Sequence, residues 1–128
     1  MDIAKDLALI DGLRTRAVPA EPGADPYHRA VLGLRAWESA QDCYAYEDAV
    51  AERLTERWGE PSRWGTTTLV ERAARGEHIP EPWAMLSTWA TDLRTWEADD
   101  RWITLTAIDG DSEELPQVYV VVTREAPP

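Results

Sequence analysis

The sequence predicts an α+β fold in which N-terminal helices, one of them long, pack on a small C-terminal antiparallel β-meander. Apolar residues recur at helical spacing in the first half of the chain, whereas apolar and polar residues alternate in the last third. The chain has 128 residues, which suits a single domain over residues 1–128. No segment approaches the roughly 18 consecutive apolar residues of a membrane span, so we expect none.

The N-terminal segment, residues 2–16, is predicted to be a helix. Ile3, Leu7 and Ile10 fall on one helical stripe, and Gly12 weakens the helix by about 1 kcal/mol relative to alanine. Residues 17–26 contain three prolines and a glycine, which is typical of a loop.

A long second helix is predicted over residues 26–58. Asp25 is a good N-cap, Pro26 suits the first helical position, and Gly59 stands where a glycine ends a helix. At 1.5 Å per residue this helix would span about 50 Å, which is long for so small a domain. We therefore expect it to bend, at Gly33 or over residues 43–46, or to project at one end towards a partner.

The middle of the chain is predicted to be irregular. Residues 60–68 form a turn, and residues 69–75 form a short helix that ends at Gly76. The stretch "EHIPEPWAM" (77–85) has two prolines, Pro80 and Pro82, that disfavour helical geometry in the residues before them. We interpret it as a stiff extended joint rather than a binding motif.

The C-terminal part favours strands. Residues 83–96 fit either a strand rich in threonine and tryptophan or a helix that starts near Pro82, and we predict a strand. Apolar and polar residues alternate in residues 101–108 and 117–124, which are predicted to form an antiparallel hairpin connected by "DGDSEELP". The sequence "EADD" (97–100) offers a tight turn from the preceding segment into this hairpin.

The charge balance limits the classes of partner. There are 24 acidic and 13 basic residues, giving a formal net charge of −11. Such a charge opposes binding to nucleic acid or to an anionic membrane and favours a basic protein or a cation, although it also simply promotes solubility. We find no signal peptide at the N-terminus and expect a cytoplasmic protein.

The familiar catalytic and cofactor motifs are missing from the sequence. It contains no GxGxxG, no GxxxxGK[ST], no GxSxG and no HExxH pattern. Cys43 is the single cysteine, so neither an internal disulfide nor a cysteine-based zinc site can form, and we expect it to be buried. We predict no catalytic residue, no metal and no cofactor.

Two features suggest a binding surface. Asp48, Glu52 and Glu56 are four residues apart and therefore lie on one face of the predicted helix, which is either a solvated surface or an acidic docking strip. Seven tryptophans accompany no phenylalanine. In a strand, Trp83 and Trp89 would share a face and could form a hot spot for a partner, unless they fill the core.

We interpret the chain as a small acidic non-enzymatic protein-interaction module. It would bind a basic protein through Asp48, Glu52, Glu56, Trp83 and Trp89, as an immunity-type or antitoxin-type inhibitor or as an adaptor. The alternative is a ligand-binding domain or small enzyme, in which His28 or His78 meets a carboxylate in a pocket between helix and sheet. Self-association into a homo-oligomer is the third possibility.

Overall fold

The computed structural model describes residues 2–16, 27–108 and 115–128. Its helices are α1 (Ile3–Thr15), α2 (Ala40–Trp58), α3 (Thr67–Ala74) and α4 (Trp83–Trp89). Its strands are β1 (Tyr27–Leu32), β2 (Ser62–Gly65), β3 (Asp92–Ala98), β4 (Arg101–Ile108) and β5 (Gln117–Thr123).

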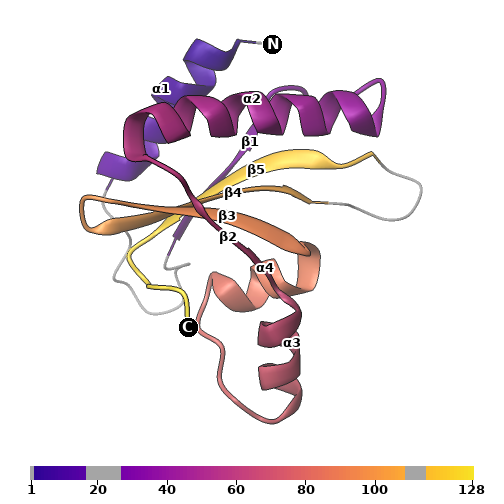
Figure 1. Cartoon of the computed structure of the whole chain (residues 1–128), viewed down its shortest axis with the longest axis vertical. Coiled ribbons are helices and arrows are strands. Elements are labelled where there is room, and N and C mark those ends of the chain that lie inside the picture. Colours follow the sequence, from indigo (N-terminus) through magenta and orange to yellow (C-terminus); the bar gives the residue numbers. More distant parts are fainter. Residues whose placement is uncertain (1, 17–26, 109–114) are drawn as a thin grey trace.

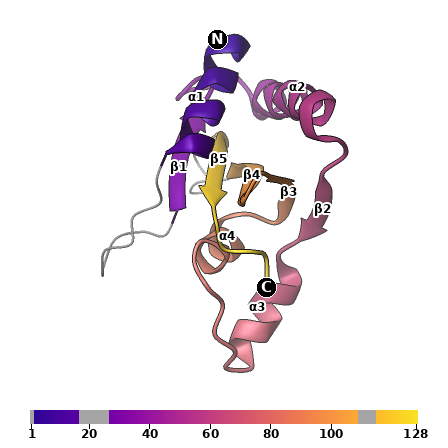
Figure 2. The same cartoon turned by 90° about the vertical axis from the view of Figure 1, so that its left-hand side faces the viewer.

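The fold is α+β, as predicted, and has three layers. The strands form one antiparallel sheet in the order β1-β5-β4-β3-β2. Helices α1 and α2 cover one face of this sheet, and α3 and α4 lie against the other (Figure 1). Figure 2 shows the layers edge-on, with β1 and β2 at the two edges of the sheet.

The predicted meander is confirmed as the centre of the sheet. β4 and β5 pair from Trp102 opposite Thr123 to Ile108 opposite Gln117. β3 joins β4 through a tight turn, where Asp99 takes a positive φ of 59°. Aspartate tolerates this left-handed conformation better than most residues do, which explains why the acidic sequence 97–100 makes the turn.

The prediction of one long helix over residues 26–58 is wrong for its first half. Residues 27–32 form the edge strand β1, and α2 begins only after Ser39, whose side chain accepts a hydrogen bond from the Asp42 N–H at 3.2 Å. The end of the helix is correct, because Gly59 follows its last residue with a φ of 84°. The proposed cap at Asp25 and Pro26 lies outside the described residues, as does the loop predicted at 17–26.

The shorter elements were predicted with mixed success. The helix predicted at 69–75 is confirmed as α3, but part of the predicted turn at 60–68 is the strand β2. The strand predicted at 83–96 is wrong over its first half, which is α4, and correct over its second half, which is β3. The helical and the strand pattern of this segment therefore both correspond to observed elements, first the helix and then the strand.

The sheet has a hydrophobic core on each face. The larger core lies under α1 and α2 and contains Ile10, Leu54, Ile103 and the fully buried Cys43, as predicted for the cysteine. The smaller core lies against α3 and α4 and surrounds Trp83. Burial on both faces explains why β4 and β5 are buried along nearly their whole length.

A compact junction fixes where α2 starts. Gly33 has a φ of 71°, and its N–H donates to the Asp6 carboxylate of α1 at 2.8 Å. The Tyr46 hydroxyl donates to the same carboxylate oxygen, and the rings of Trp37 and Tyr46 lie 5.5 Å apart. Burial and the neighbouring Asp6 raise the pKa of Tyr46, so its hydroxyl stays a donor.

We predict that Gly33→Ala lowers the free energy of unfolding by about 2–4 kcal/mol. A Cβ at this position would lie 2.6 Å from Cζ2 of Trp37, and the positive φ is itself unfavourable for alanine. Gly12→Ala in α1 is the matched control, because a Cβ there meets no atom within 4 Å. It should raise the free energy of unfolding by about 0.5–1 kcal/mol. Urea denaturation measures both, and equal effects would contradict the role given to Gly33.

Candidate functional site

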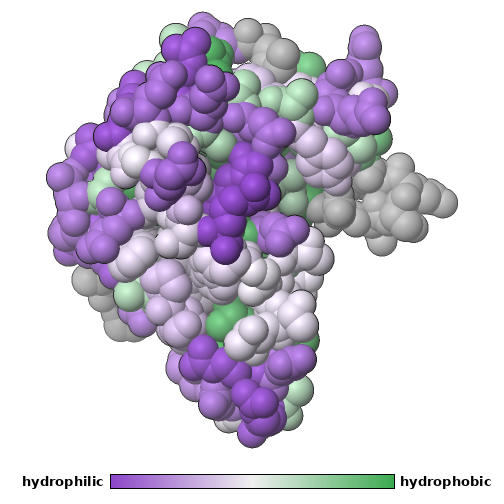
Figure 3. All heavy atoms as spheres, viewed as in Figure 1, coloured by the Kyte–Doolittle hydropathy of each residue, from purple (hydrophilic) through white to green (hydrophobic). Residues whose placement is uncertain are grey.

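The predicted acidic residues lie together on the outer face of α2. Asp48, Glu52 and Glu56 are exposed, on the side of the helix opposite the buried Val50 and Leu54. Figure 3 shows hydrophilic residues gathered over this part of the molecule, at the upper left of the view. The helix was predicted with the wrong start, but its 3.6-residue repeat still places these carboxylates on one stripe.

The three carboxylates are not equivalent. Asp48 forms an ion pair with Arg94 of β3 at 2.5 Å, so part of its charge is already balanced. Glu52 and Glu56 have no ion-pair partner within 4.0 Å among the described residues. Arg57 points instead to α1, where it pairs with Asp11 at 2.8 Å. The C-terminal half of α2 therefore presents two exposed carboxylates that form no ion pair among the described residues, beside the exposed Arg53.

An apolar depression of about 430 Å³ lies along the N-terminal half of the same helix. It lies on the α1 side of α2, and its lining combines apolar side chains with two carboxylates: Leu34, Trp37, Glu38, Asp42, Ala45, Tyr46 and Ala49. Leu34 is 38% exposed, although it is a large aliphatic residue. An exposed apolar surface with an acidic rim is a common feature of binding sites for other proteins.

The two tryptophans proposed for partner binding are separated. Trp83 is 0% exposed and its indole N–H donates to the carbonyl of Glu125, so it belongs to the core and not to a surface. Trp83 lies in the first turn of α4 and its side chain faces the sheet. The strand prediction did not anticipate this orientation. Trp89 is 47% exposed, at the other end of α4, where the guanidinium of Arg29 lies 5.6 Å from its ring. It lies on the face of the sheet opposite α2.

The two histidines are not brought to a common pocket. His28 lies in the edge strand β1 and is half-buried, whereas His78 is exposed in the joint between α3 and α4. A pocket between α2 and the sheet does exist, as the alternative interpretation required. Its nine lining residues include neither histidine and no tryptophan.

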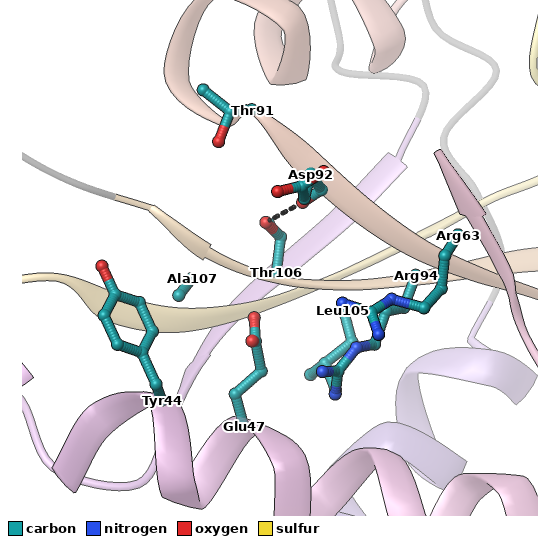
Figure 4. A pocket seen from close by; sticks show the side chains of 9 residues that line it. All are labelled: Tyr44, Glu47, Arg63, Thr91, Asp92, Arg94, Leu105, Thr106 and Ala107. Carbon is teal, nitrogen blue, oxygen red and sulfur yellow. Dashed lines mark hydrogen bonds between the residues drawn. The ribbon is translucent and has the colours of Figure 1, made fainter. Parts of the chain in front are cut away.

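This pocket, of about 270 Å³, is polar (Figure 4). Tyr44 and Glu47 reach it from α2, and Arg63 and Arg94 reach it from β2 and β3. Asp92, Thr91, Thr106, Leu105 and Ala107 complete the lining. In Figure 4 the carboxylate of Glu47 points from the helix towards the sheet, between the Tyr44 ring and the two arginines.

The pocket forms where β3 separates from β4. The pairing of these strands ends at Arg94 opposite Leu105, although both strands continue. Beyond that point the Thr106 hydroxyl donates to the Asp92 carbonyl at 2.8 Å, in place of a backbone hydrogen bond. The Ala107 N–H bonds the Glu47 carboxylate. Side chains thus satisfy the backbone groups that the opening of the sheet releases.

Glu47 has an unusual environment for a carboxylate. Burial raises its pKa above the ordinary value of 4.5, and the charge of Asp48 acts in the same direction. The guanidinium of Arg94, the Ala107 N–H and the guanidinium of Arg63 oppose that rise. A partly desolvated acid beside two arginines suits ligand binding or proton transfer.

Sequence reasoning missed this pocket because its residues come from four elements. Only the strand register brings Arg63 opposite Arg94, and that register depends on β2, which was not predicted. Among the described residues, no group of three or more His, Cys, Asp or Glu side chains is placed to hold a metal ion. Within those same residues, no helix combines the length and the apolar character needed to cross a membrane.

We predict that Arg94→Gln raises the pKa of Glu47 further, because it removes the strongest interaction that lowers it. Carbon-13 NMR titration of the Glu47 carboxyl measures the change, and Arg53→Gln on the exposed side of α2 is the control. A raised folded-state pKa means that the stabilising contribution of Glu47 is complete below pH 4.5 and is lost as the pH rises through the folded value. A wild-type pKa at or below 4.5, or a fall in Arg94→Gln, would contradict this account.

Comparison with known proteins gives no information on function. No protein-family model matches the chain, and neither the curated proteins nor the solved structures give a significant match.

Proposed function

We propose that the chain is a protein-interaction module that binds a basic protein through the outer face of α2. Its action would be that of an inhibitor of the immunity or antitoxin type, or of an adaptor. One observation carries the proposal: within the described residues the exposed Glu52 and Glu56 form no ion pair, and the N-terminal half of the same helix lines an apolar depression with an acidic rim.

The chemistry of this surface fits a partner with lysine and arginine residues around an apolar side chain. The depression has room for such a side chain, which would lose its contact with water there and contribute most of the affinity. Glu38, Asp42, Glu52 and Glu56 would face the surrounding cations. The net charge of −11 would steer a basic partner towards the chain and accelerate association at low salt.

Rigidity also supports this use of α2. The helix is held from below by the larger core and from the side by the Arg57–Asp11 pair. A surface that is ordered before binding loses little conformational entropy when the partner arrives. Trp89 lies on the opposite face of the sheet, so it would serve a separate contact. The buried thiol of Cys43 suits a reducing compartment such as the cytoplasm.

We predict that the double charge reversal Glu52→Lys/Glu56→Lys weakens binding of the partner at least about ten-fold. Each exposed ion pair contributes about 0.2–1 kcal/mol, and reversal adds repulsion of similar size, so two sites together lose about 0.8–4 kcal/mol, a range whose middle lies above the roughly 1.4 kcal/mol of a ten-fold change. The measurement compares proteins retained by immobilised wild type and variant, identified by mass spectrometry and then titrated as purified proteins.

The matched control is Glu71→Lys/Glu97→Lys, which changes the net charge equally but lies away from α2, on α3 and β3. It should retain the partner that the α2 variant loses. Equal loss from both variants would reduce the effect to net charge. Equal retention by both would show that α2 is not the docking surface. Sedimentation of the wild type alone would reveal whether the partner is a second copy of the chain.

A further inference from the structure

The pocket on the other side of α2 has a feature that the acidic face does not explain. Arg63 and Arg94 stand directly opposite each other on the antiparallel strands β2 and β3. Like charges at directly opposed positions of a sheet are destabilising. Both side chains reach the same pocket, and Figure 4 shows their guanidinium groups close together.

The repulsion is only partly relieved within the chain. Arg94, whose side chain is 15% exposed, pairs with Asp48. Among the described residues Arg63 has no ion-pair partner within 4.0 Å and no side-chain hydrogen bond, and only its longer-range attraction to the Glu47 carboxylate offsets the repulsion. Guanidinium groups bind carboxylates in a planar two-point geometry, so this end of the pocket is prepared for an anionic group of a ligand.

The remainder of the pocket has the opposite polarity. The carboxylate of Glu47 points into it from α2, and Asp92 lies on its β3 wall. Tyr44 adds a hydroxyl at the far side from the arginines. A phosphate or another multiply charged anion would meet these carboxylates at short range, whereas a simple cation would meet the arginines. Neither kind of ion satisfies both ends.

We propose that the pocket binds a small zwitterion, a free amino acid or a molecule of the same kind, with its carboxylate at Arg63 and Arg94 and its ammonium group at Glu47 and Asp92. The volume of about 270 Å³ lies just below the range of roughly 300–1,000 Å³ that is usual for pockets of drug-sized ligands, so it suits a smaller molecule such as an amino acid. The carbon atoms between the charges would lie on Leu105 and Ala107, which form the apolar part of the lining.

This site is separate from the acidic face of α2, and each proposal can fail without the other, although one ion pair joins the two places. Asp48 is the residue that connects them, because its carboxylate lies on the outer face and its partner Arg94 lines the pocket.

Titration followed by NMR tests the proposal directly. Propionate is L-alanine without its ammonium group, and ethylamine is L-alanine without its carboxylate group. We expect saturable shifts of the Tyr44, Glu47 and Ala107 amides with alanine at millimolar concentrations, and binding at least ten-fold weaker with propionate and ethylamine. Equal binding of propionate would make this an anion site, and equal binding of ethylamine a cation site. Either result overturns the proposal, as does no saturable shift with glycine, alanine or serine.

Two variants assign the ends of the ligand. Arg63→Gln and Glu47→Gln should each weaken the binding of alanine at least ten-fold, while Arg53→Gln, which changes an exposed arginine of α2, should leave it unchanged. Arg63 is exposed, so its replacement should preserve the fold, and thermal unfolding of each variant verifies this. Unchanged affinity in folded Arg63→Gln and Glu47→Gln would place the binding elsewhere.

Discussion

The position of α2 depends on one hydrogen-bonded junction, in which the Asp6 carboxylate holds both the Gly33 N–H and the Tyr46 hydroxyl. Gly33 turns the chain out of the sheet through a left-handed conformation, and Trp37 fills the space where a side chain would otherwise be. Because Tyr46 belongs to α2 and Asp6 to α1, the same contact ties both helices to one face. The acidic surface and the pocket take their positions from this arrangement.

The junction also explains which parts of the fold were predictable. The hairpin of β4 and β5 was predicted because the alternation within each strand is local, and the turn between β3 and β4 was predicted because residues 97–100 are few and acidic. The start of α2 was not, because Val31, Leu34 and Trp37 happen to be three residues apart. Val31 lies at the end of β1, whereas Leu34 and Trp37 lie in the loop after Gly33. Apolar residues from a strand and a loop can therefore show the same three-residue spacing as the apolar face of a helix. The four residues of β2 are too few to show a period of two.

The acidic face of α2 and the pocket between α2 and the sheet also differ in how far the sequence predicts them. Asp48, Glu52 and Glu56 share a face through the helical repeat alone, so their grouping survived a wrong helix start. The exposure of each tryptophan depends on tertiary packing, and Trp83 is buried because α4 turns it towards the sheet. The pocket combines α2, β2, β3 and β4, and only a known register brings its charges together. Local patterns predicted the surface, whereas long-range pairing determines the pocket.

The two outer strands of the sheet bear on how the chain behaves when it is crowded. An unpaired strand edge is a template on which another copy can add its own backbone, and such growth leads to fibrous aggregates. β2 offers only four residues, and its guanidinium-bearing Arg63 would bring like charges together in a stacked pair of copies. β1 carries Arg29, whose side chain is held against Trp89 and Tyr119. Both edge strands therefore oppose the addition of further copies. β2 does so through its short length and the charge of Arg63, and β1 through the charge of Arg29, which is held at the edge.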